Sequence, residues 1–114
     1  MPEVSILKSR RDFVSAAKVG DKFVSASLVL QVRKRRDDAG ARVGFTATRK
    51  IGGAVQRNRA KRRMRALAEA CLKPVADPSC DYVLIARHNT GAIPWPTLER
   101  DCRSLLARHG GKTG

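Results

Sequence analysis

Hydrophobic and polar positions alternate in two stretches of the chain, and this alternation predicts two β-strands. The stretches are residues 27–33 (SLVLQVR) and 42–48 (RVGFTAT), each with apolar side chains at every second position. Residues 34–41 between them are mostly polar and include Gly40, so we expect a hairpin loop. The pattern is typical of an antiparallel sheet with one face against a core. Residues 22–25 predict a further short strand.

A third pattern, the apolar run at 82–87 (YVLIAR), predicts a short strand in the centre of the sheet. It is too short for a helix of its own and is apolar enough to be covered on both faces.

The first of three predicted helices covers residues 9–19. Ser9 is followed three positions later by Asp12, which is the spacing of an N-terminal capping box. Asp12 also suits the positive end of the helix dipole. Gly20 fits the position after the last helical residue.

Two longer helices are predicted further along, each with one apolar face. One runs from about 54 to 73 and is stopped by Pro74, and the other begins near Pro96. Trp95 is interpreted as a packing residue at the start of the last helix. The side chains expected to face the core are Ala60, Met64, Leu67, Ala68 and Cys71, then Leu98, Cys102, Leu105 and Leu106.

These elements together predict an αβββαβα order, which is a single-domain α+β sandwich with the helices on one face of the sheet. With 114 residues, the chain is long enough for one domain with a modest core. We expect the ordered part to cover about 7–108 and the tails at 1–6 and 109–114 to be flexible.

The distribution of charge indicates a binding function for the helix at 54–73. The chain carries a net charge of +14, and no acidic residue lies between Asp38 and Glu69 although nine basic residues do. Solvated helix faces usually mix signs, whereas pairs such as Arg59 and Arg63 repel at i,i+4. A polyanion, most commonly nucleic acid, is therefore the expected partner. The outward face carries Asn58, Arg59, Lys61, Arg62, Arg63 and Arg65.

Other chemistry is sparse. The three cysteines are widely spaced and form no CxxC pair, which favours free thiols in a reducing cytoplasm over disulfides or a zinc site. No run approaches the roughly 18 apolar residues of a membrane helix, and no secretory signal is recognised. No paired carboxylates suggest catalysis. Gly52-Gly53 lacks the P-loop pattern and is interpreted as a turn whose amides can meet an RNA phosphate.

Two adjacent motifs carry a resemblance to a known family. RNRAKRRMR at 57–65 matches the pattern RNRxKRxxR, and GFTATRKIG at 44–52 resembles GFxxSKKxG. Together they resemble the protein subunit of bacterial ribonuclease P, and the likeness covers about 7–106. The resemblance implies a ribosomal protein S5 domain 2-like fold with a left-handed βαβ crossover, which breaks the usual right-handed rule.

The resemblance also implies a function. The protein would bind a large catalytic RNA, and the complex would remove the 5′ leader from precursor tRNA, using Mg²⁺ held mainly by the RNA. No metal site, membrane or obligate protein partner is implied for this chain. The residues implied to face the RNA subunit are Arg49, Lys50, Arg57, Asn58, Arg59, Lys61, Arg62 and Arg65. Those implied to line a leader cleft are Phe13, Ala17, Val29, Gln31 and Thr46.

The chain departs from the family pattern at three places. Members often carry aromatic residues where this chain has Ala17 and Gln31, and Ser-Lys where it has Thr48-Arg49. We therefore expect weaker base stacking in the leader cleft.

Three alternatives compete with this interpretation. The first is a ribosomal or other structural RNA-binding protein. The second is a DNA-binding regulator, although no helix precedes the basic helix at helix-turn-helix spacing. The third is an autonomous nuclease, which the missing carboxylate cluster disfavours.

Overall fold

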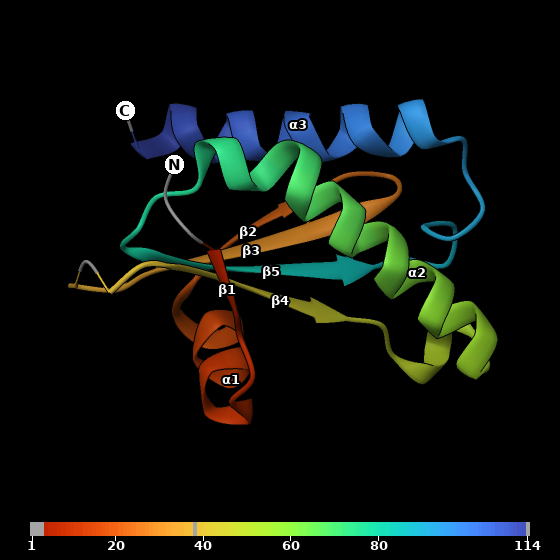
Figure 1. Ribbon diagram of the computed structural model, residues 1–114, viewed down its shortest axis with the longest axis horizontal. Helices are drawn as coiled ribbons and strands as arrows, with labels where there is room; N and C mark the ends of the chain where they lie inside the picture. Colours follow the sequence, from red (N-terminus) through yellow and green to blue (C-terminus); the bar gives the residue numbers. More distant parts are fainter. Residues whose placement is uncertain (1–3, 38, 114) are drawn as a thin grey trace.

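The computed structural model describes residues 4–37 and 39–113 and shows a five-stranded sheet with helices on both faces (Figure 1). In chain order the elements are β1 (Val4–Ile6), α1 (Arg10–Val19), β2 (Asp21–Val24), β3 (Leu28–Lys34), β4 (Ala41–Thr46), η1 (Arg49–Ile51), α2 (Ala54–Leu67), η2 (Ala68–Leu72), η3 (Lys73–Val75), β5 (Cys80–Ala86) and α3 (Trp95–Thr113). Among these residues no helix has the length and apolar character needed to cross a membrane.

The sheet has the order β1-β4-β5-β3-β2, so the expected hairpin at 34–41 is wrong. β5 lies between β3 and β4, antiparallel to the first and parallel to the second. The sheet is therefore mixed, not antiparallel. The physical reason is that the run at 82–87 is apolar at successive positions, so this strand takes the centre, where all but one residue of β5 are buried.

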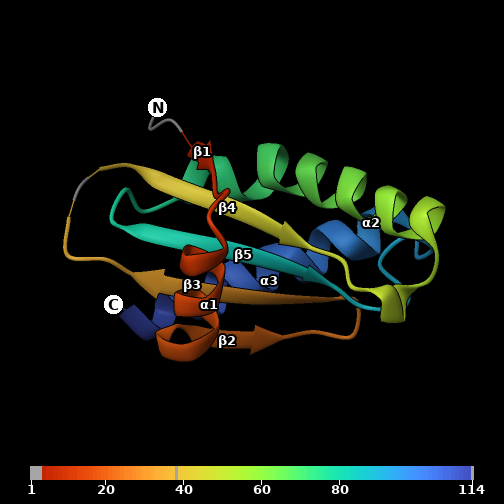
Figure 2. The ribbon, with the colours of Figure 1, turned by 90° about the horizontal axis from the view of Figure 1, so that it is seen from below.

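The α+β class and the left-handed crossover are confirmed. α2 connects the parallel neighbours β4 and β5 with a left-handed turn (Figures 1 and 2). The expectation that all helices share one face is wrong, because α1 lies on the face opposite α2 and α3. Two separate cores follow from this arrangement.

The main core fills the space between the sheet, α2 and α3. Every residue predicted to face it from the two long helices is buried. The helical path from 54 also ends close to Pro74, although its last turns are π- and 3₁₀-helical. The second core is small: Leu7, Ala16 and Val83 are buried there, with Phe13 and Ile85 packed against them.

The ends of α1 differ from the predicted capping. The side chain of Ser9 makes no capping hydrogen bond, and the carboxylate of Asp12 instead contacts Arg42 and Arg33. Gly20 is extended at φ −81°, so it is no left-handed cap. A Cβ there would lie 2.4 Å from the carbonyl oxygen of Ala16, so close backbone approach requires glycine.

Regular structure extends into both expected flexible tails. Residues 4–6 form β1 beside β4, and α3 continues through 109–113. The ring of His109 packs against Phe23 and Tyr82, with centroids 5.9 and 6.0 Å away. Residues 1–3 and 114, also assigned to the tails, lie outside the described residues.

Candidate nucleic-acid interface

The basic helix α2 presents cations outward above a buried apolar side. Asn58, Arg59, Arg62 and Arg65 are exposed, while Ala60, Met64 and Leu67 are 0% exposed. In the part of the chain that the structure describes, no salt bridge involves a basic residue between 49 and 65. This face therefore offers charge that no carboxylate neutralises.

The turn before α2 also favours an anion. Gly52 has φ 143°, a conformation that side chains rarely adopt. Gly53 is the N-cap, and no side chain caps the helix. The first turn of α2 is therefore exposed and uncapped beside the exposed Arg49 and Lys50, at the positive end of the helix dipole.

Arg63 is an exception to the predicted outward face. It is partly buried, donates a 2.8 Å hydrogen bond to the carbonyl of Thr90, and lies 5.8 Å from the ring centroid of Trp95. Trp95 thus has the packing role expected of it. Arg63 holds the loop before α3 against α2, and a helical wheel misses this because the loop comes from a distant part of the chain.

A groove opens between the start of α1, the end of β4 and α2. Its lining residues, called the groove residues below, are Lys8, Arg10, Phe13, Phe45, Thr46, Ala47 and Lys61, and its volume is about 400 Å³. Lys61, which the resemblance assigned to the RNA-subunit face, also lines this groove. The groove combines three cations with two phenyl rings, the composition that holds single-stranded RNA.

Sequence reasoning missed four groove residues. Lys8 and Arg10 belong to the basic cluster KSRR at 8–11, which could have indicated them. Phe45 was predicted to face the core, and it does pack there as well. Ala47 was likewise predicted to face the core and packs against it.

The strand register arranges the α1 face of the sheet in three rows. Arg42, Asp81 and Arg33 form the first row, Gly44, Val83 and Gln31 the second, and Thr46, Ile85 and Val29 the third. Gln31, Thr46 and Val29 therefore share one face, as strand parity predicts. Val29, however, is only 8% exposed and offers little surface to a ligand.

Phe13 belongs to both the second core and the groove. Its ring lies over Gly44, where an added Cβ would be 2.5 Å from two ring carbons. The side chain is partly exposed, and it lines the groove with its other side. Ala17, one turn later, is exposed and brings no ring to the groove.

The first row carries an ionic cluster. Asp81 is 0% exposed and accepts hydrogen bonds from Arg42 at 2.8 Å to each oxygen and from Arg35 at 2.6 Å. The hydrogen bonds that Arg42 donates to Asp81 raise the pKa of Arg42. The carboxylates of Asp81 and Asp12 are thus both paired with arginines.

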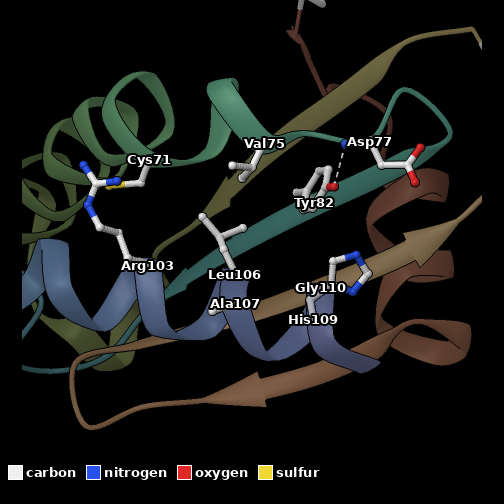
Figure 3. Close-up of a pocket in the computed structure, with 9 residues that line it drawn as sticks. All are labelled: Cys71, Val75, Asp77, Tyr82, Arg103, Leu106, Ala107, His109 and Gly110. Carbon is white, nitrogen blue, oxygen red and sulfur yellow. Dashed lines mark hydrogen bonds between the residues drawn. The ribbon is translucent and has the colours of Figure 1, made fainter. Parts of the chain in front are cut away.

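Another hollow lies between α3 and the η2–η3 turn (Figure 3). It measures about 470 Å³, and Val75, Leu106 and Tyr82 form its apolar walls. Tyr82 accepts a 2.9 Å hydrogen bond from the amide of Asp77, and burial raises its pKa to about 12. Among the described residues, Arg103 is the one arginine in its lining, which is otherwise mostly apolar or uncharged.

Metal-binding clusters are also missing from the described residues: no three His, Cys, Asp or Glu side chains gather there. The three cysteines are buried and free.

Comparison with known proteins identifies relatives. The sequence profile of the family described as ribonuclease P matches residues 1–110. The ribonuclease P protein component of Caulobacter vibrioides is 50% identical over 101 residues, covering 88% of this chain and 67% of that protein. The ribonuclease P protein component of Ruegeria pomeroyi is 42% identical over 108 residues. This match covers 92% of this chain and 86% of the Ruegeria protein.

Solved structures agree on the fold. The ribonuclease P protein from Thermotoga maritima superposes with a TM-score of 0.77 at 28% identity, covering 91% of this chain and 96% of that one. The Staphylococcus aureus protein gives a TM-score of 0.78 at 20% identity, with coverages of 94% and 96%.

Proposed function

This chain belongs to the ribonuclease P protein family and works with the ribonuclease P RNA in tRNA processing, and we propose how its two basic surfaces divide that work. The outward face of α2, with the turn before it, binds the catalytic RNA. The groove between α1, β4 and α2 binds the 5′ leader of precursor tRNA.

The observation that carries the proposal is the groove itself. Lys8, Arg10 and Lys61 line it together with the ring of Phe13. Cations bind the phosphates of a single strand, and an aromatic ring stacks on its bases. Lys61 comes from α2, so the leader-binding groove and the RNA-binding helix are continuous. A leader leaving the active site of the RNA can thus pass directly onto the protein.

In this proposal the chain binds and orients, and the RNA subunit supplies the reacting groups. The described carboxylates do not fit a Mg²⁺ site, because Asp12 and Asp81 are engaged by arginines and no cluster of ligands gathers. Mg²⁺ is therefore assigned to the RNA. The protein lowers the repulsion between two polyanions and so strengthens substrate binding. The complex acts in the cytoplasm and needs no further protein partner.

Reconstitution tests this function. The protein is mixed with a bacterial ribonuclease P RNA and precursor tRNA at near-physiological Mg²⁺, and cleavage of the leader is followed. We expect the protein to stimulate the RNA and to cut nothing alone. Robust cleavage by RNA-free protein, or no stimulation at low Mg²⁺, would contradict the proposal. The alternative of a structural RNA-binding protein without processing activity predicts no stimulation.

A further inference from the structure

Helix α1 is attached to the sheet by few apolar contacts. Ala16 is its one fully buried side chain among the described residues, and Phe13 is only partly covered. Val14 and Val19 point into solvent, at 42% and 73% exposure. A helix held so lightly can shift on the surface beneath it, unless polar contacts fix its position.

Arg42 supplies such a contact. Its Nε and Nη2 donate to the two oxygens of the buried Asp81, both at 2.8 Å. Its remaining nitrogen, Nη1, donates to Asp12 of α1 at 3.1 Å. This guanidinium thus joins the central strand β5 to α1 by hydrogen bonds, through a contact that we call the arginine bridge. Nη1 of Arg33 lies between the same two carboxylates at the longer distances of 3.5 Å from Asp12 and 3.8 Å from Asp81.

The bridge stands next to the groove. Asp12 precedes Phe13, and Arg42 lies two residues before Gly44, on which the ring of Phe13 rests. The bridge therefore fixes α1 at the first row of the sheet, and Phe13 covers the second row. The groove opens beyond, beside Thr46 in the third row.

We propose that Arg42 is a positioning residue for leader recognition: by bridging Asp81 to Asp12, it sets where α1 presents Phe13 and Arg10 to the leader. The inference rests on the proposed function of the groove. It requires the planar fork of arginine, since lysine cannot bind Asp81 at two points and Asp12 at a third.

Arg42→Lys tests the bridge without leaving a bare buried charge, because Asp81 keeps its 2.6 Å contact with Arg35. Asp12→Asn is the second variant and removes the α1 end of the bridge at a partly exposed position. Ser27→Ala is the matched control. It deletes a 2.6 Å hydrogen bond to Asp101 of α3, and so destabilises the opposite face without touching α1.

Holoenzyme is reconstituted with each variant, and its Kd for precursor tRNA and for mature tRNA is measured, with thermal melts of each protein. We expect both bridge variants to lower the precursor preference about fivefold, equivalent to ~1 kcal/mol of stacking at one base. Affinity for the RNA subunit and its salt dependence should stay unchanged, and the control should keep the full preference. The variant that combines Arg42→Lys with Asp12→Asn should show the same loss of precursor preference as either single variant.

Three results would overturn the inference. One is a precursor preference that survives both bridge variants. Another is an equal loss for precursor and mature tRNA. The third is a similar loss in Ser27→Ala, which would assign the effect to stability. If the unmodified protein shows no preference for precursor, the leader-binding function fails as well. A preference that both bridge variants retain contradicts only the role of Arg42.

Discussion

Gly44 lies directly beneath the ring of Phe13, and alanine at this position would force the two apart. A Cβ on Gly44 would stand 2.5 Å from Cε1 and Cζ of Phe13 and 3.2 Å from Cβ of Leu7. Carbon atoms in contact are separated by about 3.5–4.0 Å. The ring would therefore have to move by about 1 Å or more, or α1 would have to lift from the sheet.

Overpacking of this kind costs about 1–3 kcal/mol of unfolding free energy. For a domain of this size each 1 kcal/mol lowers the Tm by about 4 °C, so we expect Gly44→Ala to melt about 4–12 °C lower. Phe13→Ala should cost about 2 kcal/mol, roughly half the value for a fully buried ring, because the side chain is only partly covered.

The double variant distinguishes this clash from a general weakness of β4. Once Phe13 is alanine, the new methyl group has space, and Gly44→Ala should cost close to nothing. We therefore expect a coupling of at least about 1 kcal/mol in a cycle of four urea melts. Additivity within about 0.5 kcal/mol would refute the placement of the ring. Both single variants should also weaken precursor binding and leave mature tRNA nearly unaffected.

Three further predictions concern other residues. Arg59→Ala and Arg62→Ala should each lower the slope of log affinity for RNA against log salt by about 0.7–0.9, whereas Arg63→Ala should leave the slope unchanged and lower the Tm. Ala17→Phe should tighten binding of precursor over mature tRNA by about 1 kcal/mol, which competition binding measures. Tyr82 is the single tyrosine, so absorbance at 295 nm should show no ionisation of the folded protein near pH 10. Its folded pKa of about 12 lies above that of the unfolded chain, about 10, so stability should fall by roughly 2–3 kcal/mol between pH 10 and 12. Unchanged slopes, an unchanged precursor preference, or ionisation near pH 10 without unfolding would contradict the respective predictions.

Sequence pattern identified what each strand and helix buries, because that information is local. Alternation placed Val43 and Leu30 toward the main core, and helical spacing did so for Met64 and Leu105, all of which are buried. The pairing of strands could not be predicted in this way, because alternation shows which face of a strand is covered and does not show which strand lies beside it. β5 could therefore be recognised as central while its insertion between β3 and β4 was missed.

The location of α1 was missed for a related reason. The face it covers mixes Arg42, Gly44, Asp81 and Val83, and no periodic apolar pattern marks such a surface as buried. Asp12 was predicted to belong to a capping box because it lies three residues after Ser9. Its partner Arg42, 30 positions away, takes its carboxylate instead.

The candidate site was predictable in composition and less so in arrangement. The motif at 57–65 indicates a nucleic-acid surface, but a helical wheel gives Lys61, Arg62 and Arg63 the same exposed status. Their surroundings in the fold differ. Lys61 lines the groove, whereas Arg63 donates a hydrogen bond to the carbonyl of Thr90 in the loop before α3.

The central place of β5 has a consequence for synthesis on the ribosome. β5 follows the other four strands of the sheet in the chain, yet both β3 and β4 pair with it. Before residues 80–86 leave the exit tunnel, those strands have no common partner, so the sheet cannot close progressively from the N-terminus. Such long-range pairing slows folding. A chain truncated before Cys80 would therefore keep the basic segment 49–65 but lack the strand that joins β3 to β4.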